Sequence, residues 1–572
     1  IGEGGPSYEG VNAPIADILG LSRPNPYGSS PDIGAYENGL STTPYPVPVK
    51  NLTAVGGSQS VTLSWDAVVS ADSVYKIYQH SSAFSIDATY FVDTTSSTSY
   101  TISGLDNTTR YYFRVSAVNT KGYEGTASSS IDITPKYSGP VWWISTSGSD
   151  TNEGSSGGPF KTIKYALEQV TAGDTVMLKS GTYSGTGNLE IEISSSITSV
   201  NFDNYKNLVL TSEKGADSTI IDAGNDGRHF SIIGNQSNTI DSTLQFIGLT
   251  FIGGQRSDFG GSFYIETQTY WDDNSQTNLA PQMQPKFKNC VFKDNEAFKD
   301  NEGAPGGSFW ISNGSPIFEN CTFDSNSSNR FGGAIAFGGD NMAKIDTIWF
   351  RDCTFNNNNV DDNNQTQNNP KQSFGGAIAL EFGMNIIINN SVFNNNEVHK
   401  SNNSSSADGG ALGIRREWSS NINPYIRISN SRFTKNKVNH DYGNDGGAAR
   451  GGAIYVGAPI IMVNTLVDSN SINAINGNNG NTAGGGLFIS IQSQWDNNNQ
   501  IYGYSYLINN TIVDNYAGAT DQNSAKAAGI FIDNPDQMRG TWFNNIIWGN
   551  RSNGLEDRQN LNRMDENQFT LV

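Results

Sequence analysis

The 572-residue chain has little charge, few cysteines and no long apolar run. Only 16% of its residues are charged, and its formal net charge is −20. Such an acidic balance argues against binding to nucleic acid or to an anionic membrane. No stretch of 18 apolar residues is present, so we expect no transmembrane segment. Three cysteines cannot build a disulfide framework, and none of the four histidines lies in a recognisable motif.

A repeat dominates the sequence between about residues 286 and 550. Its first copies read Asn-Cys-Val-Phe-Lys-Asp-Asn from Asn289 and Asn-Cys-Thr-Phe-Asp-Ser-Asn from Asn320. Eight copies begin 31 to 46 residues apart, with Gly-Gly-Ala-Ile segments between them. Each repeat holds short alternating apolar runs and no window long enough for an amphipathic helix. The pattern predicts an all-β solenoid, a parallel β-helix whose strands stack at roughly 4.8 Å and whose loops vary in length.

The first asparagine of the repeat predicts a ladder at one corner of the coils. Stacked side-chain amides can satisfy turn backbone groups from one coil to the next. The predicted ladder consists of Asn289, Asn320, Asp352, Asn390, Asn430, Asn464, Asn510 and Asn545.

The following positions of the repeat predict inward-facing columns. Cys290, Cys321 and Cys353 form one, continued by Ser391 and Ser431. Metal binding or a redox pair is the alternative for the cysteines, but close C-x-x-C spacing is absent, so we favour a buried core. An aromatic column follows, with the members Phe292, Phe323, Phe355, Phe393 and Phe433, then Val467, Val513 and Trp548.

Residues 45–136 have a different character. Alternating strands are predicted at 61–65, 75–78 and 111–118, separated by turn residues at the spacing of a β-sandwich. The segment resembles fibronectin type III domains, in which Trp65 would be the core tryptophan of the second strand. The family's L-xxx-T-x-Y-x-F-x-V signature is matched by Leu105, Thr109, Tyr111, Phe113 and Val115. The resemblance implies that Tyr111 is the tyrosine-corner residue, holding the loop from Leu105.

Residues 137–572 are expected to form the β-helix. A short helix is predicted from Ile163, with Thr162 as its N-cap and one apolar face, and it would cover the open edge of the first coil. The segments GSDTNEG, PFKTI, AGDTV and GTY resemble the entry of pectate-lyase-like right-handed β-helix proteins, and the later repeats resemble those of polymorphic outer-membrane proteins. The fold hosts both enzymes and inert surface proteins.

Residues 1–44 predict a terminal coil. The stretch with Asp32, Ile33 and Tyr36 resembles the strand that closes bacterial surface β-helices, whereas the predicted β-helix ends uncapped near Val572. The chain also opens at Ile1 without an initiator methionine or a signal peptide, so we expect a mature or excised piece. Either the chain is a segment cut from a giant protein of tandem repeats, or residues 1–44 of one copy complete the open C-terminal coil of a neighbouring copy.

Catalytic patterns are sparse. Asp361-Asp362 and Asp272-Asp273 are acidic candidates in Asn-rich inserts, and Arg415 belongs to an isolated group without lyase-motif neighbours. Residues 150–154 lack the full liganding spacing for calcium. We therefore expect no catalytic residues, no metal site and no cofactor, with calcium as the one ion left open.

Three tryptophans follow the Gly-Gly strands of their coils. Trp271, Trp418 and Trp495 stand beside amide or acidic residues and should lie along one edge of the solenoid. They can bind sugar faces, pack the inserts onto the wall or make contacts between subunits.

Together these features favour an extracellular, cell-surface structural or adhesive protein that repeats head to tail. Its main partner would be another copy of itself. The alternative is a polysaccharide-binding or polysaccharide-lyase-like β-helix enzyme with an accessory fibronectin type III module.

Overall fold

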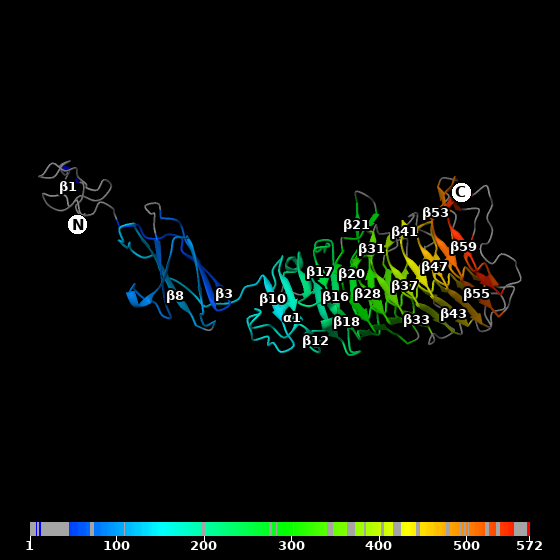
Figure 1. Cartoon of the computed structure of the whole chain (residues 1–572), viewed down its shortest axis with the longest axis horizontal. Helices are drawn as coiled ribbons and strands as arrows, with labels where there is room; N and C mark the ends of the chain where they lie inside the picture. Colours follow the sequence, from blue (N-terminus) through cyan, green and yellow to red (C-terminus); the bar gives the residue numbers. More distant parts are fainter. Residues whose placement is uncertain are drawn as a thin grey trace. The chain divides into compact units, whose positions relative to one another are not determined.

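The computed structural model describes residues 7–8, 11–12 and 45–571. Within the last range it leaves out residues 69–73, 108, 197–200, 274–276, 282, 301, 340–346, 363–371, 382–384, 402–404, 416–424, 442–446, 476–480, 491–493, 497–498, 502, 521–524, 534–537 and 554–568. The chain divides into two compact units, Ile1–Ser138 and Gly139–Val572 (Figure 1). Within the described ranges, no helix is both long and apolar enough to span a lipid bilayer.

The first unit contains the predicted antiparallel β-sandwich. One sheet has the order β3 (Thr53–Gly57), β4 (Ser60–Ser64), β7 (Ser99–Ser103). The other has the order β6 (Phe91–Thr95), β5 (Val74–His80), β8 (Tyr111–Val118), β9 (Ile131–Ile133). A short pair, β1 (Ser7–Tyr8) and β2 (Val11–Asn12), precedes them.

The sandwich core confirms the expected positions. Trp65 and Phe113 are buried between the sheets. The Tyr111 hydroxyl accepts a hydrogen bond from the backbone N–H of Asp106 at 3.1 Å, which holds the loop as the tyrosine corner predicts.

The second unit is a right-handed parallel β-helix, as the sequence predicts. We number its five sheets in the order in which a coil visits them. Sheet one contains β10 (Val141–Ile144), β11 (Thr175–Leu178), β14 (Val209–Ser212), β17 (Gln245–Ile247), β23 (Lys286–Lys288), β27 (Ile317–Glu319), β31 (Ile348–Arg351), β36 (Ile386–Asn389), β41 (Ile426–Ser429), β46 (Ile460–Val463), β53 (Gly503–Ile508), β58 (Met538–Phe543) and β61 (Phe569–Leu571).

Sheet two contains β12 (Gly181–Ser184), β15 (Thr219–Asp222), β18 (Thr250–Ile252), β24 (Val291–Lys293), β28 (Thr322–Asp324), β32 (Thr354–Asn356), β37 (Val392–Asn394), β42 (Arg432–Thr434), β47 (Leu466–Asp468), β54 (Thr511–Val513) and β59 (Ile546–Trp548). Sheet three contains β19 (Gln255–Arg256), β25 (Glu296–Ala297), β29 (Ser327–Ser328), β33 (Asn359–Asp362), β38 (Glu397–Lys400), β43 (Lys437–Asp441), β48 (Ser471–Ile475), β55 (Tyr516–Ala519) and β60 (Arg551–Ser552).

Sheet four is short and contains β34 (Ser373–Phe374), β39 (Ala407–Asp408), β44 (Ala448–Arg450), β49 (Asn481–Ala483) and β56 (Ala525–Lys526). Sheet five contains β13 (Ile191–Ser194), β16 (Phe230–Gly234), β20 (Phe263–Thr267), β26 (Phe309–Ser312), β30 (Ile335–Gly338), β35 (Ile378–Leu380), β40 (Leu412–Ile414), β45 (Ile454–Val456), β50 (Leu487–Ser490) and β57 (Ile530–Asp533). Antiparallel hairpins project from two coils, β21 (Tyr270–Asp272) with β22 (Thr277–Leu279), and β51 (Gln494–Asp496) with β52 (Asn499–Ile501).

The first coil is covered by the expected helix, α1 (Ile163–Leu167). The Thr162 hydroxyl accepts from the backbone N–H of Tyr165, and Ile163, Ala166 and Leu167 are buried. Short 3-10 helices lie at Ala88–Tyr90, Phe202–Tyr205 and Ala216–Ser218. At the Gly-Gly turns the coils approach closely: a Cβ on Gly376 would lie 2.0 Å from the carbonyl oxygen of Gly410, so only glycine fits there.

The predicted aromatic column fills the core, with one correction. The rings of Phe323, Phe355, Phe393 and Phe433 stack at 4.5–4.6 Å. In the last two coils, however, Val467 is followed by Ile512 and Ile547, not by Val513 and Trp548. Trp548 is 75% exposed. The two coils carry a doubled asparagine, Asn509-Asn510 and Asn544-Asn545, and the turn is made by the first of each pair.

Candidate functional site

Two columns of asparagine run along the coils. The predicted column is exposed and lies in the left-handed region, with φ of 49–55° at Asn289, Asn320, Asp352, Asn390, Asn430 and Asn464. Its amides bond between some coils, as from Asn320 Nδ2 to Asn289 Oδ1 at 2.9 Å and from Asn464 Nδ2 to Asn430 Oδ1 at 2.8 Å. In the last two coils Asn509 and Asn544 take this position, while the predicted Asn510 and Asn545 occupy the inward position next to it.

The second column was missed from sequence. It lies six residues further on, and its members are almost fully buried: Asn295, Asn326, Asn358, Asn396, Asn436, Asn470, Asn515 and Asn550. From Asn295 to Asn515, each Nδ2 donates to the Oδ1 of the next coil at 2.8–2.9 Å. Each Oδ1 also accepts the backbone N–H of the coil before, and each Nδ2 donates to a backbone carbonyl, so the amides are fully bonded. The invariant Phe/Val/Ile-x-x-Asn spacing carried the information that could have located it.

Cys290, Cys321 and Cys353 are free and buried in the inward column. The thiols of Cys321 and Cys353 point at backbone carbonyls at 3.2–3.5 Å. Burial raises the pKa of the Cys321 thiol, which opposes metal ligation by thiolate. No cluster of three or more histidine, cysteine or acidic side chains suited to a metal ion occurs in the described part of the chain.

The other predicted site residues lie apart from these columns. Trp271 is 59% exposed in the hairpin β21–β22. Trp495 belongs to β51, which pairs with β52 in a second hairpin after sheet five, and its side chain is outside the described set. Trp418, Asp32, Ile33 and Tyr36 lie outside the described residues. Asp150, weighed as a calcium ligand, accepts from Lys161 N, Thr162 N and Thr162 Oγ1 instead.

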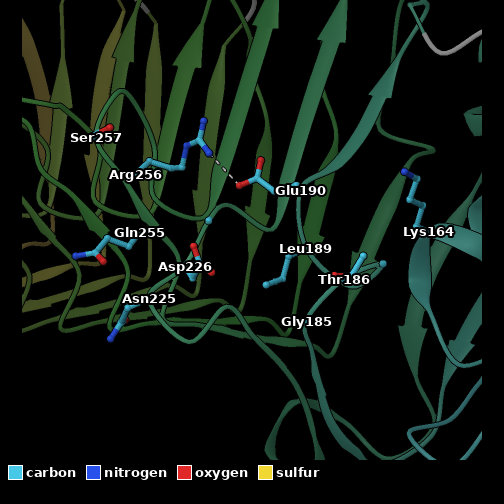
Figure 2. A pocket seen from close by; sticks show the side chains of 12 residues that line it. Lys164, Gly185, Thr186, Leu189, Glu190, Asn225, Asp226, Gln255, Arg256 and Ser257 are labelled. Carbon is cyan, nitrogen blue, oxygen red and sulfur yellow. Dashed lines mark hydrogen bonds and ion pairs between the residues drawn. The ribbon is translucent and has the colours of Figure 1, made fainter.

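A cleft of about 780 Å³ opens at the corner of the first three coils (Figure 2). Three successive turns and α1 line it through Lys164, Gly185, Thr186, Gly187, Leu189, Glu190, Asn225, Asp226, Gly227, Gln255, Arg256 and Ser257. The turn at Gly187 sits against the helix cap, because a Cβ there would meet Thr162 at 2.8 Å. The cleft was not predicted, because these turns lie in the weakly repeating early coils.

An ion-pair chain crosses the cleft. Arg256 Nη1 lies 3.0 Å from Glu190 Oε1, and the two side chains point toward each other in Figure 2. Arg256 and the buried Arg228 also contact Asp258, at 3.4 and 2.9 Å. Burial acts to raise the pKa of Asp258, but Arg228 and the other donors outweigh it and hold that pKa below its usual range. The cleft therefore presents fixed charges and the amides of Asn225 and Gln255, suited to a polar ligand, and no aromatic ring is among its lining residues.

A second charged cluster lies between sheets three and four. The sequence suggested that Asp361 and Asp362 stand in an insert loop, which is wrong: both belong to β33, and Asp362 is 1% exposed. It contacts Lys400 on the next coil, whose side chain is 0% exposed. Ser373, which belongs to sheet four, is hydrogen-bonded to both members of this pair.

Arg415, which appeared isolated in sequence, belongs to a neighbouring network. Its guanidinium lies 2.7 Å from Asp408, which also receives Nε and Nη2 of Arg450 at 2.7 and 2.8 Å. Arg415 stacks on Phe374, and Arg450 on Tyr455. Both guanidinium groups are therefore engaged with the carboxylate of Asp408.

Comparisons with known proteins identify the domain that forms the sandwich of the first unit. Residues 47–134 match the family model for the fibronectin type III domain. A curated relative, YwoF of Bacillus subtilis (strain 168), is 40% identical over 83 residues, which are 14% of this chain and 17% of that protein. The chain thus spans about a sixth of the length of the curated relative that it matches.

Among solved structures, a rhamnogalacturonan lyase is 14% identical, with a TM-score of 0.33 and coverage of 70% of this chain and 86% of that chain. The pectate lyase Pel9A is 13% identical, with a TM-score of 0.29 and coverage of 74% and 78%.

Proposed function

We propose that the protein is an extracellular structural or adhesive element of a cell surface, which associates head to tail through the open end of its β-helix. The main support for this proposal is that, within the described residues, the two ends of the β-helix differ. α1 covers the first coil, whereas β59 in sheet two is paired on one side only. An uncovered strand edge is a template for pairing with another chain.

Exposed apolar side chains on this last strand support the proposal. Ile546 is 59% exposed and Trp548 is 75% exposed. We propose that a second copy of this chain binds the open strand edge, and that its residues 1–44 supply a closing strand around Asp32, Ile33 and Tyr36. The buried asparagine column also supports a structural role, because its hydrogen bonds connect each coil from Asn295 to Asn550 with the next.

The test is the assembly state of the full chain, measured by analytical ultracentrifugation and electron microscopy over a range of concentrations. We expect filaments or concentration-dependent oligomers, and their loss in the double variant Ile546→Lys, Trp548→Lys. The matched control is Val392→Lys, since Val392 occupies the same outward column in the middle of the solenoid and is 37% exposed. A chain that stays monomeric at every concentration contradicts the proposal.

A second function, polysaccharide binding, is favoured by the cleft alone. Glu190 and Asp226 also line the cleft and Glu190 pairs with Arg256, whereas Lys164 has no ion-pair partner among the described residues. Lys164 therefore suits a carboxylate of an acidic oligosaccharide, and the amides of Asn225 and Gln255 suit its hydroxyls. The probe is a galacturonate oligomer, titrated calorimetrically into the full chain. We expect binding that Lys164→Met weakens and that Lys161→Met, an exposed lysine outside the cleft, leaves unchanged. If the two variants bound the oligomer with the same affinity, binding at this site would be contradicted.

A further inference from the structure

The space between sheets three and four holds a lysine and an aspartate in a dry setting. Asp362 ends β33 and Lys400 ends β38, and the two residues are direct register partners on successive coils. Their side chains are 1% and 0% exposed and are in contact. On the same faces of the two strands, Val360 and Val398 belong to an apolar cluster with alanines of sheet four. The pair is thus fixed in place and shielded from water.

Ser373 of β34 bridges the two groups. Lys400 Nζ donates to Ser373 Oγ at 3.2 Å, and Ser373 Oγ donates to Asp362 Oδ2 at 2.5 Å. This arrangement is a proton path from the amine to one carboxyl oxygen. The other oxygen, Oδ1, is buried and has no hydrogen-bond partner within the described residues. A carboxylate in this position therefore has one uncompensated oxygen, which is costly in a dry interior.

Burial also favours the uncharged forms of the pair. It raises the pKa of Asp362 and lowers the pKa of Lys400, in each case against the attraction of the partner. The charge of Asp408 acts to raise the pKa of Lys400, and the charge of Arg415 acts to lower it. Transfer of the ammonium proton to the carboxylate gives a free amine beside a carboxylic acid, and these are the reacting forms in amide formation.

We propose that Asp362 and Lys400 condense to an intramolecular isopeptide bond that joins two successive coils. The Nζ lone pair attacks Cγ of the protonated carboxyl group, and a tetrahedral centre forms. One Nζ proton passes through Ser373 Oγ to Oδ2, which then leaves as water together with the proton that it already carried. The products are one amide and one water molecule, so no oxidant, reductant or external reactant is needed.

The dry site also disfavours the reverse reaction. Hydrolysis of an amide in water is helped by ionisation of the acid and the amine that it releases, and burial penalises both ions here. The amide carbonyl retains Oδ1, and a neutral carbonyl without a partner is less costly than an ionised carboxylate without one. The bond would join two residues that lie 38 positions apart in sequence, and it would prevent these two coils from separating.

The experiment is the intact mass of the purified full chain. We expect wild type to weigh less than its sequence by the mass of one water molecule, and Lys400→Met to have its full sequence mass. Protease mapping should yield a branched peptide that joins Asp362 to Lys400. The matched control is the pair Lys286–Glu319, which also joins successive coils at 2.7 Å but is 20–23% exposed, and no branched peptide is expected there.

Ser373→Ala tests the relay separately. Loss of a positioned proton carrier typically slows a reaction by about a hundred-fold or more, so uncross-linked protein should accumulate in this variant. Equal cross-linking in Ser373→Ala would overturn the role of Ser373. Wild-type protein at its full sequence mass after prolonged incubation would overturn the bond itself, and that measurement does not depend on whether any variant folds.

Discussion

Two asparagine columns run along the same coils, six residues apart in every repeat, and differ in their surroundings. The column that begins at Asn289 is exposed, and its asparagines share a backbone conformation with φ near 50°. The column that begins at Asn295 is buried, and its amides form one continuous hydrogen-bonded chain. Asparagine is used in the first column for a turn conformation and in the second for its donors and acceptors.

Periodicity alone does not reveal which chemical property of a residue is used in a repeat. In the exposed column, water can replace a lost amide contact. In the buried column it cannot, because removing one amide leaves backbone and side-chain groups on two neighbouring coils without partners. The energetic consequences of the same substitution should therefore differ by several-fold between the columns.

The largest effect is expected for Asn396→Ala in the buried column. Asn396 donates to Phe355 O and Asn436 Oδ1, and it accepts two bonds from Asn358. Leaving several of these groups buried and unpaired should lower the free energy of unfolding by about 3–5 kcal/mol. Urea unfolding of the full chain, followed by tryptophan fluorescence, measures this change. A loss below about 1 kcal/mol would mean that water enters the column and that the burial argument fails.

A smaller effect should come from acid acting on another buried polar group. His229 is buried, bonded to Ser262 Oγ at 2.8 Å and to Ile221 O at 3.0 Å. Burial lowers its pKa to about 4, whereas an exposed histidine titrates near 6.5. Below pH 6.5 the unfolded chain therefore binds a proton that the folded chain does not. Stability should fall as pH drops from 6.5 toward 4, by about 3 kcal/mol in all.

Unfolding of wild type and His229→Gln at pH 7 and pH 4.5 checks this sign. The variant should lose less stability than wild type on acidification, because it lacks the titrating group. His399→Gln is the control, since His399 is an exposed residue of sheet three. An identical loss in wild type and in His229→Gln would show that other groups dominate the acid response.

Much of the fold could be predicted because it rests on local patterns. The alternation around Tyr111, the capped helix at Thr162 and the Phe column each follow from residue types at fixed spacing. The register of the last two coils was predicted wrongly because of doubled asparagines such as Asn509-Asn510. Either asparagine fits the repeat, and only the left-handed backbone conformation shows which of them makes the turn.

The candidate sites could be predicted only in part, because they depend on contacts between distant segments. The sequence places Asp362 in a polar insert and makes no prediction for Lys400, since the strands of sheet four that bury both residues are as short as two residues. The cleft joins α1 to turns near Glu190 and Arg256, which lie 66 residues apart in sequence. No repeat spacing connects those residues in advance.

The smallest effect, and the sharpest test of the comparison, is expected in the exposed column at Asn390. Its φ of 50° disfavours any residue with a Cβ other than asparagine or aspartate, so Asn390→Ala should cost about 1 kcal/mol. Asn390→Gly relieves the backbone and should change the free energy of unfolding by only a few tenths of a kcal/mol, about what the lost contact from Nδ2 to Asp352 is worth at an exposed position. Urea unfolding of both variants beside Asn396→Ala measures all three. If glycine proved as costly as alanine at Asn390, the side-chain contact rather than the turn conformation would be the reason for asparagine there, and the two columns would be alike.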